Sequence, residues 1–526
     1  MAEDTWEAAR LISVSGINGA DEQERRGASA LLAVIESVRE FGRAIVQPLG
    51  APAGTISTFI EVNMSLGDRT VRPDGAIRVV RGGRSWTALI EVKTGRNDLA
   101  ANQIEDYLDA AREHGFDAVL TISNQLVAAP GDLPCEVDKR KLRKVALYHL
   151  SWSEIHTEAV IQRLNRSVSD PDQAWILAEL IRYLEHAKSG AVDFDDMGAA
   201  WVGVRDAAAQ RTLRQNDKSA AEVADTFAQL VAFSGMRLSR DLGVDVTPAI
   251  SKMELADKAA RTQKAVAQLV EHGTLEGTLR VPNAIAPFTI TADLRSGHAR
   301  CSLVVDAPAD GRPATRVNWL VRQLANASEK TLIEATTARA RRGSSPATLA
   351  ALREDPRLVI EDPTKEIKSF KITLSVVAGT KRGHGRGSFV ESVLDLAERF
   401  YVEVVQNIRP WSASAPRVKA TGVDEDDYGT SEITGELPTR ATLAARATEP
   451  RQSMDEPTDP RDAVDASARP YNEDEFSADP APESHVIVQR EAEVDECSDQ
   501  STTSRGQDDS SAGSLLGGEA DEHAER

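Results

Sequence analysis

The sequence predicts an α/β protein that begins with a unit of the order helix, three strands, helix, strand. Residues 20–125 contain runs with the spacing of one helix face and shorter runs rich in β-branched residues, separated by turn residues. Residues 151–273 are mainly helical in pattern, and strand-like runs return over 274–412. With 526 residues, the chain is long enough for two or three folded units.

The first helix is expected from Asp21 to Val46, because its apolar residues recur on one helical face. A stretch rich in proline and glycine, Pro48–Gly54, separates it from the strands that follow. Enrichment in β-branched residues and bounding turn signals then predict three strands, over Thr58–Met64, Asp74–Arg81 and Ser85–Lys93.

A second helix is expected over Asp98–His114, with Asn97 as its N-cap and Gly115 as its end. The apolar run Ala118–Ser123 then predicts a buried strand. These elements complete the first unit.

Four regions are therefore expected: an α/β domain over 1–150, a helical region over 151–273, an α/β domain of unknown role over 274–412, and an acidic tail over 413–526. Residues 421–526 hold 28 acidic and 8 basic side chains, a net charge of -20, whereas 54 acidic and 54 basic residues cancel over 1–420. The tail is also poor in aromatic residues, so we expect it to be disordered. Its charge favours solubility, with recruitment or exclusion of a partner as the alternative.

The loop Gly82-Gly83 predicts a hairpin, because both glycines can take positive φ. Such a loop fixes which residues of the two strands face each other. Paired residue numbers then sum to 165, which puts Asp74 opposite Glu91 with their Cβ atoms about 4.5–5.5 Å apart. Lys93 projects from the same face as Glu91, because side chains alternate along a strand.

Two facing carboxylates repel each other, and a divalent cation removes that conflict. Mg²⁺ prefers oxygen ligands and keeps several waters, so Asp74 and Glu91 together with a substrate phosphate form a plausible shell. The ammonium of Lys93 can hold the scissile phosphate or the attacking water. The residues therefore predict phosphodiester hydrolysis. The competing interpretation is a solvated pair of acids at a sheet edge, with Lys93 balancing their charge.

Arg72-Pro73-Asp74-Gly75, followed by Leu89-Ile90-Glu91-Val92-Lys93-Thr94-Gly95, resembles the paired motifs of the PD-(D/E)XK nuclease superfamily. The predicted element order also resembles the αβββαβ, restriction-endonuclease-like core of that superfamily. The resemblance implies that Asp74 and Glu91 are metal ligands and that Lys93 is the catalytic lysine. It implies Mg²⁺ as the cofactor, with Mn²⁺ able to substitute.

Many members of this superfamily add a glutamate from the first helix, and the resemblance implies Glu24 as this further metal ligand, with Glu22 and Glu36 as rivals. Many also place a glutamine near the scissile phosphate, on the helix after the lysine strand, and Gln103 matches that position. Tyr107 lies one turn further on the same helix face, where core packing is the simpler role.

The expected function is a magnesium-dependent nuclease acting on DNA, in genome defence or repair. RNA as substrate, endonuclease against exonuclease action, and a homo-oligomeric state stay open. The alternative is a catalytically inactive nuclease-like scaffold that binds nucleic acid or a protein. In that case the second α/β unit or the acidic tail contacts the partner.

Basic runs offer further contacts to nucleic acid. Lys139–Lys144 lies beside the predicted nuclease core, and the runs Arg339–Gly343 and Lys381–Gly387 are rich in arginine and glycine. For each run, a solvated surface is the alternative.

Other classes of protein find little support in the sequence. The three cysteines, Cys135, Cys301 and Cys497, lack paired spacing, which argues against a disulfide framework or a structural zinc site. The histidines lack metal-binding spacing. Without an apolar run of membrane-spanning length or a signal-like N-terminus, a cytoplasmic protein without a membrane partner is expected.

Overall fold

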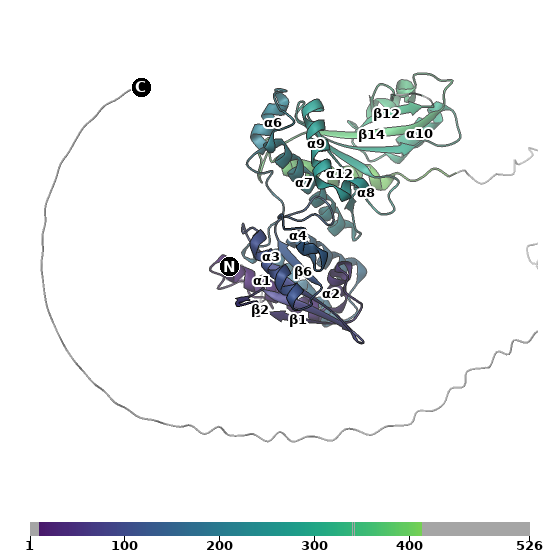
Figure 1. Cartoon of the computed structure of the whole chain (residues 1–526). Helices are drawn as coiled ribbons and strands as arrows, with labels where there is room; N and C mark the ends of the chain where they lie inside the picture. The colour runs from purple at the N-terminus through teal and green to yellow at the C-terminus, as the bar shows by residue number, and fades with distance from the viewer. Residues whose placement is uncertain (1–9, 339, 341, 413–526) are drawn as a thin grey trace, which may run out of the picture. The chain divides into compact units, whose positions relative to one another are not determined.

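The structure of the chain is a computed structural model that describes residues 10–338, 340 and 342–412, and these residues form a mixed α/β protein (Figure 1). Within this range lie a five-stranded sheet, a seven-stranded sheet and a small two-stranded hairpin. The predicted disordered tail over 413–526 lies outside the described residues.

The five-stranded sheet contains the strands predicted for the first unit. Its order is β1 (Thr55–Ile60), β4 (Gly75–Arg81), β5 (Arg84–Val92), β6 (Ala118–Ser123) and β7 (Ala146–Ser151). The first three strands are antiparallel, and β5, β6 and β7 run parallel to one another. The prediction for Ala118–Ser123 is confirmed, and those for the two hairpin strands are confirmed to within one residue at each end.

The prediction of a single strand over Thr58–Met64 is wrong at both ends, because β1 begins at Thr55 and ends at Ile60. The chain leaves the sheet after Ile60, where Glu61 takes a φ of +50°, which ends the extended backbone. Residues from Met64 onward form the separate hairpin of β2 (Met64–Leu66) and β3 (Arg69–Val71).

The predicted register of the β4–β5 hairpin is confirmed. Its pairs run from Arg81 with Arg84 to Gly75 with Ile90. Gly82 has a φ of +58°, whereas Gly83 lies outside the left-handed region. Positive φ at the first loop residue is the pattern of a type II′ turn. The next rung beyond Gly75 and Ile90 brings Asp74 and Glu91 together.

Two predictions about helices need correction. The helix expected from Asp21 to Val46 is two helices, α1 (Ala20–Ser37) and α2 (Arg39–Val46), because Val38 takes an extended conformation between them. Helix α3 (Ala101–Glu113) begins after Ala100. Asn97 is therefore not its N-cap, and its side chain instead donates a hydrogen bond to a carboxylate of the candidate site.

The sheet of the first unit lies between two apolar layers, because successive β5 residues point to opposite faces. Ala88 and Ile90 pack with α1, α2, α4 (Trp152–Ile161) and α5 (Pro171–Leu184). Leu89 packs on the other face with α3 and the β2–β3 hairpin. Glu91 and Lys93 follow Leu89 at intervals of two, so they belong to the α3 face.

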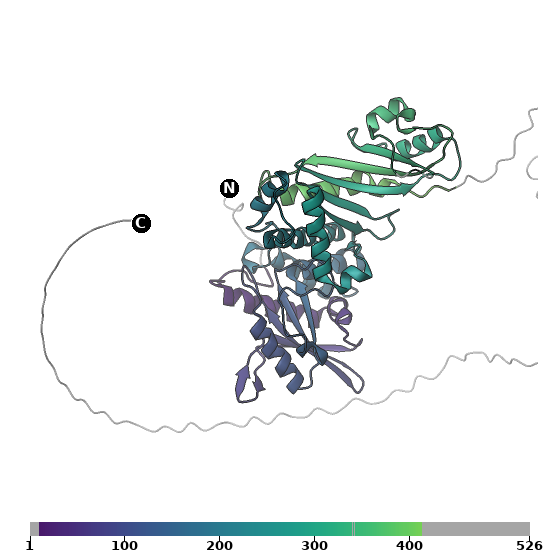
Figure 2. The same cartoon turned by 45° about the horizontal axis from the view of Figure 1, so that its top comes forward.

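The seven-stranded sheet is antiparallel and supports a core of its own. Its order is β13 (Ala347–Thr348), β12 (Leu332–Thr337), β14 (Ile367–Val377), β11 (His298–Asp306), β10 (Phe288–Asp293), β9 (Thr274–Arg280) and β8 (Thr247–Pro248). Figure 2 shows its long strands in teal and green. The remaining helices are α6 (Trp201–Ala209), α7 (Lys218–Leu242), α8 (Lys252–Ala256), α9 (Lys258–His272), α10 (Pro313–Gln323), α11 (Leu349–Glu354) and α12 (Phe389–Glu403).

The helices of residues 151–273 pack in two different cores. Trp152 of α4 and Leu177 of α5 belong to the core of the first sheet. Trp201 of α6, Phe227 of α7 and Leu269 of α9 belong to the core of the second sheet. None of the described helices combines the length and the apolar character needed to cross a bilayer.

Candidate active site

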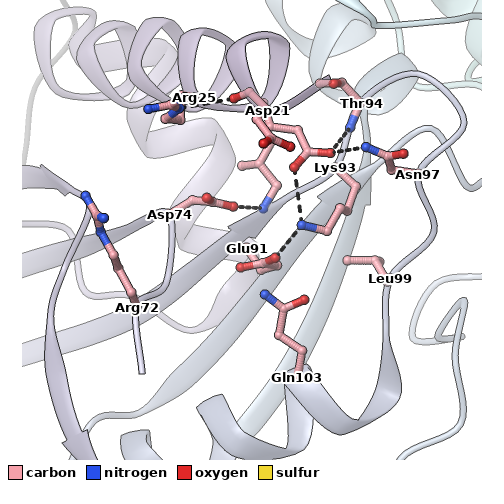
Figure 3. A network of polar contacts seen from close by, with 12 residues as sticks. Asp21, Arg25, Arg72, Asp74, Glu91, Lys93, Thr94, Asn97, Leu99 and Gln103 are labelled. Atoms are coloured by element: carbon pink, nitrogen blue, oxygen red, sulfur yellow. Dashed lines mark hydrogen bonds and ion pairs between the residues drawn. The ribbon is translucent and has the colours of Figure 1, made fainter. Parts of the chain in front are cut away.

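Asp74, Glu91 and Lys93 lie together at one end of the first sheet (Figure 3). Asp74 directly precedes β4, Glu91 lies near the end of β5, and Lys93 directly follows β5. The Nζ atom of Lys93 donates a hydrogen bond of 2.7 Å to Oε1 of Glu91. Oδ2 of Asp74 accepts a hydrogen bond of 2.8 Å from the backbone N–H of Val92. The register of one hairpin thus brings two acids and a lysine to one place.

Glu24 reaches the same place from α1. Its Oε2 lies 3.3 Å from Nζ of Lys93, and its Oε1 accepts a hydrogen bond of 2.7 Å from Nδ2 of Asn97. The backbone N–H of Thr94 donates to the same oxygen at 3.5 Å. Glu24 is buried, because the turn after β5, which bonds to its carboxylate through Thr94 and Asn97, covers it.

The two rival glutamates lie elsewhere. Glu22 forms an ion pair of 2.7 Å with Arg26 on the same helix. Glu36 accepts hydrogen bonds from the backbone and the hydroxyl of Thr58 in β1. Of the three candidates, the structure brings Glu24 to the site.

Burial and charge raise the pKa values of both acids. Glu91 is only 1% exposed, and its burial, reinforced by the negative charge of Asp74, raises its pKa to about 7 despite the hydrogen bond from Lys93. Burial also raises the pKa of Asp74, against the opposing effect of its bond to Val92. For Lys93, burial alone would lower the pKa, but its bond to Glu91 and the surrounding negative charge outweigh that effect and raise it.

Glu91 carries an unused acceptor. Its Oε2 atom is buried and has no hydrogen-bond partner among the described residues. A buried carboxylate oxygen without a partner is unfavourable unless a proton or a cation compensates it. The neighbouring carboxylate of Asp74 makes a cation the better match, so this pair fits a divalent metal.

Glu24 fits the metal less well in this arrangement, because Lys93 and Asn97 engage both of its oxygens. Within the described residues, no group of three or more histidine, cysteine or acidic side chains is arranged to hold a metal ion. Mg²⁺ often takes only one or two protein carboxylates and completes its shell with water and substrate oxygens. Asp74 and Glu91 meet that smaller requirement.

Helix α3 places Gln103 and Tyr107 beside the acids. Nε2 of Gln103 donates a 2.9 Å hydrogen bond to the Tyr107 hydroxyl, which donates in turn to the backbone oxygen of Arg72 at 3.1 Å. Figure 3 shows Gln103 rising from its helix toward Glu91. Tyr107 packs in the core, as predicted, and burial raises the pKa of its hydroxyl, which therefore stays protonated.

Three further residues support the site and were missed by sequence reasoning. Asn97 binds Glu24, as described. Nε1 of Trp152 donates a 2.9 Å hydrogen bond to the backbone oxygen of Lys93. The backbone oxygen of Gly190 accepts from the N–H of Gly95 at 2.8 Å. Trp152 and Gly190 lie far from the motifs along the chain, and no local pattern marks them.

The basic runs are partly neutralised by acids. Lys141 forms ion pairs with Asp109 at 2.6 Å and Glu105 at 3.6 Å, both on α3. In the last run, Arg382 and His384 lie 3.5 Å and 3.3 Å from Asp196 and Asp195, respectively. Arg339 and Arg341 lie outside the described residues.

Comparison with known proteins identified no relative of this chain. No protein-family model matches the chain, and no curated protein matches it significantly.

Proposed function

We propose that the first unit is a magnesium-dependent nuclease of the PD-(D/E)XK type that hydrolyses phosphodiester bonds in DNA. One observation carries this proposal: Asp74, Glu91 and Lys93 meet on one sheet face, and a buried oxygen of Glu91 has no hydrogen-bond partner within the described part of the chain. The order of elements supports it. An antiparallel β1, β4 and β5, followed by α3 and a parallel β6, agrees with the αβββαβ core of that superfamily.

The residues divide the work by their chemistry. Asp74 and Glu91 would hold Mg²⁺, which stabilises the negative charge that develops on the phosphate. Lys93, a partly buried cation, would hold the scissile phosphate or the attacking water through its Nζ protons. Gln103 would orient the phosphate from α3. Glu24 and Asn97 would position Lys93, because Glu24 binds both residues at once.

A non-catalytic scaffold is the second candidate. It is favoured by the engagement of Lys93 with two carboxylates, which leaves the lysine in a closed ion-pair network. Such a protein would bind DNA or a protein partner without cleaving it. In both cases we propose that residues 274–412 select the substrate or the partner.

A cleavage assay distinguishes the two functions. The purified protein is incubated with linear, circular and single-stranded DNA in the presence of Mg²⁺, Mn²⁺ or EDTA. A nuclease is expected to cleave with either metal and to be inactive with EDTA. Cleavage of circular DNA would identify an endonuclease, and restriction of activity to linear DNA an exonuclease.

Two substitutions make the assay specific. Lys93→Ala should abolish cleavage. Lys264→Ala, which removes a lysine from an equally short but exposed ion pair with Glu254, should leave cleavage unchanged. Retained DNA binding without cleavage in the unsubstituted protein would support the scaffold. Activity that survives Lys93→Ala would refute the assigned site.

A further inference from the structure

A hollow of about 320 Å³ lies against the acids of the candidate site. One water takes about 30 Å³ of liquid volume, so the hollow has room for a phosphodiester group and its solvent. Its lining combines Glu24 and Asp74 of the site with further charged residues on its outer wall, namely Asp21, Arg25, Glu61 and Arg72.

Arg25 and Arg72 are the cations of this wall. Both are exposed, and in Figure 3 both lie on the side of Asp74 away from Lys93. Arg25 belongs to α1, one residue after Glu24, and Arg72 lies two residues before Asp74. Each arginine is therefore attached to the backbone next to an acid of the site, from where its exposed side chain can reach the hollow.

Arg72 is bound to Glu61 by an ion pair of 2.5 Å. The two side chains are 56% and 44% exposed, and an ion pair this exposed contributes little to stability. A phosphate carries a full negative charge and accepts two parallel hydrogen bonds from a guanidinium. A substrate phosphate in the hollow could therefore replace Glu61 as the partner of Arg72 at little cost.

Glu61 itself occupies an unfavourable conformation. Its φ of +50° strains a residue that has a side chain, whereas glycine adopts this conformation freely. The backbone N–H of Glu61 donates a 2.8 Å hydrogen bond to the backbone oxygen of Asp74, which holds this turn against the site. A carboxylate at a position better suited to glycine suggests that the side chain is needed there.

Without a metal, the hollow repels nucleic acid, because four carboxylates outnumber two guanidinium groups. A divalent cation held by Asp74 and Glu91 would bring the balance close to neutrality. Contacts from Arg25 and Arg72 would then decide where the backbone of the substrate lies.

We infer that Arg25 and Arg72 bind the DNA backbone at the phosphate next to the scissile one, and that Glu61 holds Arg72 in place until that phosphate displaces it. This inference rests on the proposed nuclease function. Glu61 then competes with the DNA phosphate for Arg72. The two members of this ion pair therefore have opposite effects on DNA binding.

The test measures the affinity for a fluorescent DNA duplex with Mg²⁺ present, in full-length protein carrying Lys93→Ala so that the DNA stays intact. Arg72→Gln is expected to weaken binding about tenfold, as for the loss of a charge-assisted hydrogen bond. It should also lower the slope of log affinity against log salt by about 0.9. Arg25→Gln should weaken binding in the same way. Glu61→Gln should strengthen binding severalfold.

A control substitution, Arg166→Gln, breaks an exposed arginine–aspartate pair with Asp245, outside both the candidate site and residues 274–412, and should leave DNA binding unchanged. If Arg72→Gln and Glu61→Gln both weaken binding equally, the pair is structural and the inference is wrong. If Arg72→Gln has no effect while the unsubstituted protein cleaves DNA, only the inference fails. If the unsubstituted protein neither binds nor cleaves DNA, the proposed function fails as well.

Discussion

At the scale of single residues, burial and the charges around Lys93 together set the pKa values of the candidate site. Lys93 lies between Glu24 and Glu91, and its side chain is only 17% exposed. Asp74 adds a third carboxylate close by. Burial of Glu91, reinforced by the negative charge of Asp74, raises its pKa to about 7, and the hydrogen bond from the single, partly buried Lys93 only partly offsets these two effects.

We predict that Glu91 makes the metal-free protein less stable as the pH rises from about 4.5 to 7. The pKa of Glu91 is raised from 4.5 to about 7 in the folded state, so its contribution is fully present below pH 4.5 and is lost as the pH passes 7. The expected loss is about 3 kcal/mol. The free energies of unfolding of the unsubstituted protein and Glu91→Gln are compared in EDTA from pH 4.5 to 8. Parallel pH profiles for the two proteins would contradict the prediction.

We predict that Lys93→Ala destabilises the metal-free protein at pH 8 by about 2 kcal/mol, because it leaves partly buried carboxylates without their cation. At pH 5 the loss should be smaller, since Glu91 is then protonated. Urea unfolding at the two pH values measures the difference. Lys264→Ala breaks an ion pair whose lysine is 73% exposed and should cost no more than about 1 kcal/mol at either pH.

The sequence was sufficient to predict that Asp74, Glu91 and Lys93 lie close together, because a two-residue turn fixes the register over a short range. The sequence did not decide which of three glutamates in the first helix reaches the site. Only the packing of α1 against the turn after β5 separates Glu24 from Glu22 and Glu36. Asn97 has the local features of an N-cap, and its bond to Glu24 depends on a residue 73 positions away.

At the scale of elements, local sequence signals predicted which segments form strands better than they predicted where those strands end. β6 was predicted at its exact bounds, because its apolar run is flanked by polar residues. The end of β1 was not predicted, because Glu61 still bonds the backbone of Asp74, its partner in the β1–β4 register, while its positive φ ends the extended backbone. The break at Val38 between α1 and α2 is of the same kind, since Val38 is fully buried and keeps the apolar spacing of a helix.

We predict that Gly75→Ala impairs both stability and the site. A Cβ atom at Gly75 would lie 2.5 Å from Cδ1 of Leu32 and 2.6 Å from the backbone oxygen of Phe59 in β1. The strain should cost about 1–3 kcal/mol and shift the adjacent Asp74. Thermal unfolding and the cleavage assay measure the two effects.

Gly83→Ala is the matched control in the same hairpin. A Cβ atom there meets no atom within 4 Å, and the residue does not need a left-handed backbone. This variant should keep its activity and unfold within about 0.5 kcal/mol of the unsubstituted protein. Equal losses of stability and activity in the two variants would show that the close packing at Gly75 is not what supports the site.

At the scale of the whole molecule, the sequence could not divide the helices of residues 151–273 between the two sheets. Helical spacing shows which face of a helix is apolar but not which sheet that face covers. Trp152 and Trp201 are both fully buried residues at the start of a helix, yet they belong to different cores. Such assignments depend on contacts between distant parts of the chain.

We predict that Mg²⁺ stabilises the folded protein, because the unfolded chain does not bring Asp74 and Glu91 together. Mg²⁺ at one hundred times its dissociation constant should add about 2.7 kcal/mol. The gain should be larger at pH 8 than at pH 6, since Glu91 must lose its proton before it binds a cation. Thermal unfolding with and without Mg²⁺ checks this, and Glu91→Gln should lose most of the gain.

The hydrogen bond from Trp152 to Lys93 limits how short a fragment of the chain can be if it is to keep the candidate site intact. A fragment ending at residue 150 would cut through β7 and remove the indole that supports the lysine backbone. It would also uncover the apolar surface on which α4 and α5 rest, and so favour aggregation. An excised piece should therefore extend to about residue 192, where Gly190 has already closed the turn after Lys93.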